Sequence, residues 1–242
     1  MRVSLFVTCL IDQLWPAVGS SAVEVLRRAG CEVVFDARQT CCGQPAFNTG
    51  YRNEARRLAR RFIEIFEEGN ADAIVSPSGS CTAMARHFHE LFADDEPWRK
   101  RAEAIAARTY EFGSFLVDVL GIDDVGASFK GRVTWHDACH GLRDLGVREE
   151  PRRLIRNVRG AEFVELVNAD ACCGFGGTFS VKYPEISVAI LDNKIDAIEK
   201  AGVRAVVSAD ASCLMQIGGR LTRKGSKARV MHLAELLAAR EQ

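Results

Sequence analysis

The chain has 242 residues, of which 48% are hydrophobic and 26% are charged, and its 32 basic residues balance 32 acidic ones. This composition excludes an intrinsically disordered protein, and the lack of a basic excess argues against a nucleic-acid binder. No apolar run reaches the ~18 residues of a membrane span, and the first segment, MRVSLFVTCLID, reads as a strand rather than a signal peptide. We therefore expect a cytoplasmic protein.

The first half of the chain alternates short β-rich segments with helical ones. Ala55, Leu58, Phe62 and Phe66 form an apolar stripe at helical spacing, which predicts an amphipathic helix. Apolar and β-branched runs on either side predict strands at residues 3–8, 32–35 and 73–76. Strands that alternate with helices in this way form parallel βαβ units, with helices covering the faces of the sheet.

A connecting segment at residues 93–130 leads into a second half of the same design. The turn-rich stretch GIDDVGASFKG, residues 121–131, marks the boundary. Strands are then predicted at residues 132–137, 162–167 and 205–208, and a helical stripe at Val188, Leu191, Ile195 and Ile198. The sequence thus predicts an α/β fold of two pseudo-symmetric, Rossmann-like halves with short parallel sheets. We expect residues 1–125 to hold the first repeat with the connecting helices, and residues 126–242 to hold the second.

The triplet Cys-Cys-Gly occurs twice, at residues 41–43 and 172–174. In each half another cysteine lies 32 or 33 residues before the triplet, and a fourth lies 39 or 40 residues after its second cysteine. Eight of the nine cysteines therefore form two matched quartets: Cys9, Cys41, Cys42 and Cys81, and then Cys139, Cys172, Cys173 and Cys213. The ninth, Cys31, is matched by Glu162 in the second half, and we interpret it as a buried structural thiol.

Every member of a quartet follows a predicted strand. Ligands bind at the carboxyl edge of open parallel sheets, so residues that are far apart in sequence can converge there. We therefore expect each quartet to form one site at the strand ends.

Four thiols at one edge are compatible with an iron–sulfur cluster, tetrahedral zinc, or a dithiol–disulfide cycle. Zinc sites usually use paired C-x2–4-C ligands, which this chain lacks. Adjacent cysteines such as Cys41 and Cys42 are poor disulfide partners, because their Cα atoms are only ~3.8 Å apart. Adjacent thiolates can reach different irons, and Gly43 and Gly174 allow a cluster to approach the backbone. These points favour iron–sulfur clusters and leave zinc and thiol chemistry open.

Several segments resemble a known family. They are TCLIDQLWPAVGSSAVEVLRRAG, CCGQPAFNTGYRNEAR, SPSGSCTAM, WHDACHGLRDLG and CCGFGGTFSVKYPEIS. The paired triplets resemble the CCG cysteine-rich domain, and nearly the whole chain resembles the lactate utilization protein A family. The resemblance implies an iron–sulfur, electron-transfer subunit of a system that oxidises L-lactate to pyruvate during growth on lactate. Its implied partners are a ferredoxin-type iron–sulfur protein and a third lactate utilization subunit.

The chain departs from the full pattern of the CCG domain at two positions. That pattern ends in CxxC, whereas the first position is occupied here by Ser78 in one half and Asp210 in the other. Four cysteines per site fit an ordinary 4Fe–4S cluster, or a cluster with an oxygen ligand from Asp210. The departure also leaves open whether one site is degenerate.

His136 and His140 flank Cys139, and the sequence leaves them several roles: tuning a cluster, binding it, carrying protons, or packing. Asp137 is expected to cap a helix or to orient His140. The chain has no flavin or nicotinamide fingerprint, so we expect a subunit rather than a complete enzyme. The alternatives are a zinc- or thiol-dependent oxidoreductase that acts directly on its substrate, and a non-catalytic assembly subunit.

Overall fold

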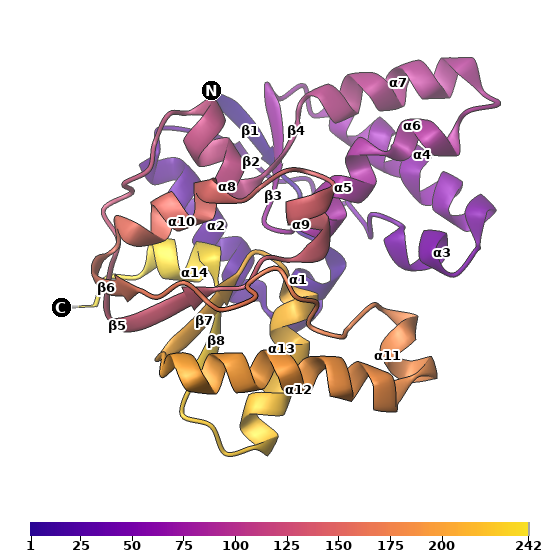
Figure 1. The fold of residues 1–242 in the computed structure, drawn as a ribbon. Coiled ribbons are helices and arrows are strands. Elements are labelled where there is room, and N and C mark those ends of the chain that lie inside the picture. Colours follow the sequence, from indigo (N-terminus) through magenta and orange to yellow (C-terminus); the bar gives the residue numbers. More distant parts are fainter. Residues whose placement is uncertain (242) are drawn as a thin grey trace.

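Two separate four-stranded sheets organise the molecule, in a computed structural model that describes residues 1–241. The first sheet has the strand order β2-β1-β3-β4, and the second has the equivalent order β6-β5-β7-β8. All neighbouring strands are parallel. The strands are β1 (Arg2–Leu5), β2 (Glu32–Val34), β3 (Ala73–Ser76), β4 (Thr109–Glu111), β5 (Ser128–Trp135), β6 (Arg159–Phe163), β7 (Ala205–Ser208) and β8 (Arg229–His232). The repeated strand order confirms the predicted α/β fold of two pseudo-symmetric halves (Figure 1).

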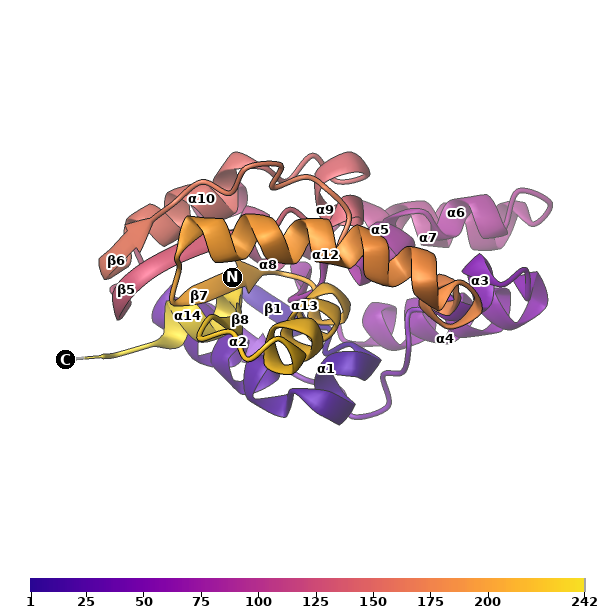
Figure 2. The same ribbon diagram turned by 60° about the horizontal axis from the view of Figure 1, so that its bottom comes forward.

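Helices connect the strands in both halves. Those of the first half are α1 (Cys9–Leu14), α2 (Pro16–Arg28), α3 (Gln44–Asn48), α4 (Arg52–Glu68), α5 (Gly79–Arg86), α6 (Phe88–Leu91), α7 (Glu96–Ala107), α8 (Phe112–Ser114) and the π-helix η1 (Phe115–Val119). Those of the second half are α9 (Cys139–Arg143), α10 (Glu149–Arg156), α11 (Thr178–Lys182), α12 (Pro184–Ala201), α13 (Ala211–Arg223) and α14 (Leu233–Ala238). Figure 2 shows α12 crossing in front of the second sheet. Among residues 1–241, no helix combines the length and the apolar character needed to cross a membrane.

Successive residues of the strands face two different cores, as the alternation of a strand requires. In β3, Ala73 and Val75 face a core that both halves share, whereas Ile74 faces the core beneath α4 and α5. β7 repeats the pattern, because Val206 faces the core beneath α12 and α13 while its neighbours join the shared core. The shared core also contains apolar side chains of α2, α10 and α14. It fixes the two sheets against each other, so the halves form one body.

The prediction from the sequence included three strands in each half and missed the fourth strand of each sheet. Both β4 and β8 are short edge strands with few apolar residues, and β4 lies in the segment that we interpreted as a connection. The predicted strands 73–76 and 205–208 coincide with β3 and β7, and Cys31 lies in the shared core as expected. The division into residues 1–125 and 126–242 stays a prediction.

Candidate metal centres

The first quartet gathers where β1, β2 and β3 end. Cys9 is the first residue of α1, Cys41 and Cys42 precede α3, and Cys81 lies in the first turn of α5. The Cys9 thiol donates a hydrogen bond to Cys41 Sγ at 3.5 Å. Cys9 and Cys41 are half-buried, whereas Cys42 and Cys81 are buried. The structure therefore brings these four cysteines together, and half of the group is shielded from water.

The second quartet repeats this arrangement at the ends of β5, β6 and β7. Cys139 is the first residue of α9, the Cys172–Cys173 pair follows β6, and Cys213 lies in the first turn of α13. Here the Cys173 thiol donates to Cys213 Sγ at 3.2 Å. Cys139 and Cys172 are half-buried, and the other two are buried. The pattern of burial is thus the same in both halves.

One cysteine in each quartet is strongly acidified by its neighbours, and in the second quartet the hydrogen bond from Cys173 and the nearby His136 imidazole also lower the pKa of Cys213, to about 6. Hydrogen bonds from the thiols of Cys42 and Cys9 lower the pKa of Cys41 to about 3, and the Gly43 amide adds a further hydrogen bond at 3.4 Å. In the second quartet, the thiols of Cys139 and Cys173 lower the pKa of Cys172 to about 2 in the same way. The lowered pKa favours the thiolate at Cys41 and Cys172, which is the form of cysteine that binds metals.

The pKa values of the thiols that donate these hydrogen bonds shift in the opposite direction. The pKa values of Cys9 and Cys139 are raised, because each thiol hydrogen-bonds to the thiolate of its quartet and is partly desolvated. Helix N-termini carry partial positive charge, and the quartets lie at the starts of α1, α5, α9 and α13. Both quartets are therefore suited to hold an anionic, sulfur-ligated group.

Glycine is required after the second cysteine pair. Gly174 has a φ of 83°, and a Cβ atom there would overlap the carbonyl oxygen of Ser187. Gly43 has a φ of 86°, a region that other residues rarely adopt. The Gly174 amide donates to Cys172 Sγ at 3.2 Å, as Gly43 does to Cys41. The glycines thus turn the backbone so that its N–H groups face the thiolates.

The two positions that depart from the CxxC pattern have structural roles of their own. The Ser78 hydroxyl caps α5 by accepting a hydrogen bond from the Cys81 amide at 3.3 Å. The Asp210 carboxylate accepts from the Ser80 amide at 2.8 Å and from its hydroxyl at 3.0 Å, so it joins the start of α13 to the start of α5. Asp210 is also bonded to the Ser212 hydroxyl at 3.0 Å. Both of its oxygens are therefore occupied by hydrogen bonds that connect the two halves.

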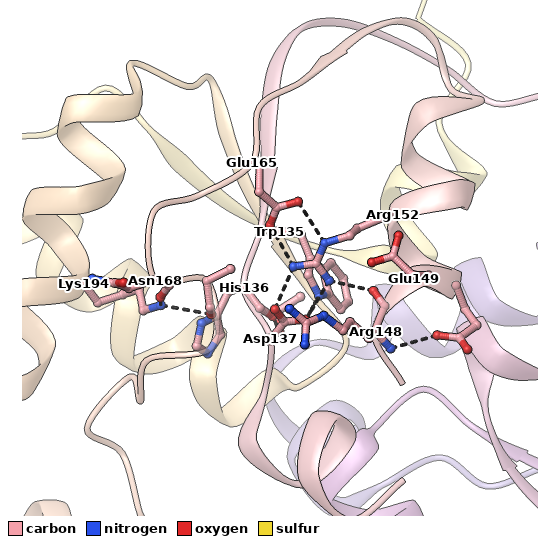
Figure 3. A network of polar contacts seen from close by, with 12 residues as sticks. Trp135, His136, Asp137, Arg148, Glu149, Arg152, Glu165, Asn168 and Lys194 are labelled. Carbon is pink, nitrogen blue, oxygen red and sulfur yellow. Dashed lines mark hydrogen bonds and ion pairs between the residues drawn. The ribbon is translucent and has the colours of Figure 1, made fainter. Parts of the chain in front are cut away.

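A buried ion pair forms at Asp137, the residue after His136 at the end of β5 (Figure 3). The Arg152 guanidinium forms a bidentate salt bridge with Asp137, at 2.9 and 2.8 Å, and another with Glu165, at 2.9 and 2.7 Å. The Trp135 indole also donates to Asp137, at 2.7 Å. We expected Asp137 to cap a helix or to orient His140. That expectation was wrong, because its carboxylate is bound by Arg152 and Trp135 instead. The ring of His140 is instead held by Asp144, at 2.5 Å.

His136 occupies the inner side of the second quartet. It is fully buried, and a ring nitrogen and the sulfur atoms of Cys173 and Cys213 all lie within 4.8 Å of one another. Lys194 is buried nearby and donates to the carbonyl oxygens of Asn168, at 2.7 Å, and Ala169, at 3.1 Å. No local pattern in the sequence marks this lysine as buried. Thiolates, alone as in the first quartet or with an imidazole as in the second, suit transition metals such as iron and zinc, so both quartets fit a metal group.

Comparison with known proteins agrees with this geometry. The family described as "Cysteine-rich domain" (CCG) matches the chain twice, at residues 3–86 and 133–218, so that each match contains one quartet. The chain is 53% identical over 236 residues to Lactate utilization protein A of Exiguobacterium sp. (strain AT1b), a match that covers 98% of this chain and 96% of that one. The chain belongs to the lactate utilization protein A family. The member of this family from Bacillus subtilis (strain 168) is 49% identical over 240 residues, which cover 99% of this chain and all of that one.

Proposed function

We propose that the chain is an iron–sulfur electron-transfer subunit of a multi-subunit system that oxidises L-lactate to pyruvate. The observation that carries the proposal is the presence of two matched cysteine quartets at the carboxyl edges of two parallel sheets. The names of the relatives supply the biological setting, which is the use of lactate. Since the chain has no flavin or nicotinamide fingerprint, the hydride of lactate would be accepted by a partner subunit.

Each quartet would hold one 4Fe–4S cluster through its four thiolates: Cys9, Cys41, Cys42 and Cys81 in the first, and Cys139, Cys172, Cys173 and Cys213 in the second. Such a cluster, when bound, accepts and releases one electron at a time. The residues of the chain position the cluster and set its surroundings. The buried cysteines of each quartet keep water from one side, and the amides of Gly43 and Gly174 stabilise negative charge on sulfur.

The half-buried cysteines lie on the outer side of each quartet, where a partner can approach. The proposed partners are a ferredoxin-type iron–sulfur protein and a third lactate utilization subunit. We propose a cytoplasmic location for this assembly. Residues 1–125 and 126–242 would be the two cluster-binding units.

The test is the content of iron and acid-labile sulfide per chain after anaerobic purification, with visible and EPR spectra before and after reduction by dithionite. Two four-iron clusters give about eight irons per chain, and Cys42→Ser or Cys173→Ser would each remove about half of them. About four irons in the unmodified chain would mean that one quartet is degenerate. A chain that carries no iron, or that oxidises lactate without a partner, would refute the proposal.

A second candidate function is zinc- or thiol-dependent chemistry on a substrate. It is favoured by the acidified Cys41 and Cys172 and by sulfur atoms only 3.2 to 3.5 Å apart. Thiolates of this kind are nucleophiles as well as metal ligands. The same purification decides between the two, because zinc and free thiols are colourless whereas iron–sulfur proteins are brown. Stoichiometric zinc, or nine free thiols with no metal, would replace the electron-transfer proposal with this one.

A further inference from the structure

The two centres differ in the buried residue that follows the first strand of each half. His136 lies three residues before Cys139, and the residue in the same place before Cys9 is Phe6. Both side chains are fully buried at the end of the first strand of their half. Phe6 packs edge-on against Phe62, with ring centroids 4.8 Å apart. The first centre therefore has an aromatic wall where the second has an imidazole.

The partner of this aromatic pair is also replaced. Phe62 lies 11 residues after Tyr51, and Lys194 lies 11 residues after the matching Tyr183. The ammonium group of Lys194 donates to two carbonyl oxygens of the loop before Cys172, and its charge is attracted to Cys173. A packed pair of phenylalanines in one half thus corresponds to a buried histidine and a buried lysine in the other. Two polar groups have been introduced into the interior at the same site.

The imidazole of His136 lacks the hydrogen bonds that a buried ring normally makes. Within residues 1–241, neither ring nitrogen makes a hydrogen bond of normal geometry, although the ring lies close enough to the Cys213 thiol to lower its pKa. The backbone is fixed, because the His136 amide donates to Val207 and its carbonyl accepts from the Ser208 hydroxyl at 3.0 Å. A buried polar group without a partner is costly, and it calls for an explanation such as an ion that it binds. The nearest candidates for shared ligation are Cys173 and Cys213, within 4.8 Å.

We propose that His136 is a metal ligand of the second centre, together with Cys173 and Cys213. The second centre then binds iron or zinc through mixed nitrogen and sulfur donors, whereas the first centre uses sulfur alone. The inference rests on the proposed function only in requiring a metal at the second centre. In the iron case, His136 adds a neutral imidazole to the thiolate ligands, and with the ammonium group of Lys194 nearby it raises the reduction potential of the second centre above that of the first.

The experiment uses the full chain, purified anaerobically with its first centre removed by Cys41→Ser and Cys42→Ser. Metal and sulfide analysis identifies what the second centre holds. If it holds iron, pulsed EPR of the reduced protein measures magnetic coupling to histidine nitrogen, with nitrogen-15 histidine as the control. If it holds zinc, X-ray absorption at the zinc edge shows whether imidazole belongs to the ligands. We expect a directly bonded nitrogen in either case.

Two variants assign the nitrogen to its residue. His136→Phe introduces the side chain that the first half carries at this place, and it should abolish the nitrogen signal. His140→Gln changes the exposed neighbouring imidazole, which is bonded to Asp144, and it should leave the signal unchanged. Should His136→Phe fail to fold, the nitrogen signal of the parent protein and its persistence in His140→Gln still test the assignment.

The outcomes separate this inference from the proposed function. Iron with sulfur ligands only, or a nitrogen signal that survives His136→Phe, would overturn the ligand assignment and leave the electron-transfer proposal intact. Zinc with one imidazole would support the ligand assignment and contradict an iron–sulfur cluster at this centre. A second centre that binds no metal would overturn the inference.

Discussion

The buried contact between Arg152 and Asp137 should be among the largest single contributions to stability, and Arg152→Met tests this. The two side chains are only 5% and 3% exposed, so neither charge is hydrated. Removing Arg152 leaves the Asp137 carboxylate with the Trp135 indole as its remaining side-chain hydrogen-bond partner. Breaking a buried pair in this way costs about 3–5 kcal/mol, because a charge stays in the interior without compensation.

For a chain of this size, each kcal/mol lowers Tm by roughly 2–4 °C, so Arg152→Met should melt roughly 6–20 °C lower. Urea unfolding followed by circular dichroism measures the free energy directly. Arg153→Met is the matched control, because its neighbouring guanidinium is 52% exposed and pairs with Asp123 at the surface. We expect a change within about 0.5 kcal/mol there.

The double variant Arg152→Met with Asp137→Asn separates charge from packing. A neutral amide keeps an acceptor for Trp135 but removes the uncompensated charge, so at least about 1 kcal/mol should be recovered relative to Arg152→Met. A loss below about 1 kcal/mol in Arg152→Met, or strictly additive effects of the two changes, would refute the reasoning.

Two further variants give predictions on stability. Gly174→Ala should lower the free energy of unfolding by more than about 1 kcal/mol and reduce the metal content, because the added Cβ atom would overlap the Ser187 carbonyl oxygen. Gly219→Ala is the control, since this position on α13 faces open space and the change should be neutral or stabilising. Urea unfolding and metal analysis of both variants check this, and equal effects would contradict it. Burial raises the pKa of Glu111 from its ordinary 4.5 to about 7, so the unfolded chain releases this proton first and stability falls as pH rises from about 4.5 to 7. The free energy of unfolding of Glu111→Gln, relative to that of the unmodified protein, should therefore rise by up to about 3 kcal/mol between pH 4.5 and pH 8. A difference that does not change with pH would show that the Glu111 carboxyl does not titrate in this range.

Much of the candidate site could be predicted because the same cysteine pattern occurs in both halves of the chain. The spacing of the cysteines repeats between the halves, and parallel strands bring residues at their carboxyl ends together whatever the connecting helices contain. The short apolar strands β3 and β7 were equally clear, since all four residues of each are buried. These features depend on local composition and on a rule of topology that holds for most sheets of this kind.

The parts that were missed depend on contacts between distant residues. Arg152 and Arg153 are adjacent in a highly charged helix, yet one is buried and the other is exposed. Nothing local marks Arg152 as the residue that meets Asp137, 15 positions away. The buried Glu111 at the end of β4 resembles a surface residue in sequence, because glutamate is rarely buried. His136 was visible as a candidate, but its position within 4.8 Å of the sulfur atoms of Cys173 and Cys213 could be known only from the packed interior.

The repeat within one polypeptide has a consequence for how the two centres can evolve. A dimer of identical subunits related by a two-fold axis must carry the same residue at equivalent positions, so a change at one centre is always copied to the other. Here the equivalent positions are encoded separately, as residues 6 and 136. Covalent linkage of the halves therefore lifts the symmetry constraint, and selection can act on one centre while the other keeps its surroundings.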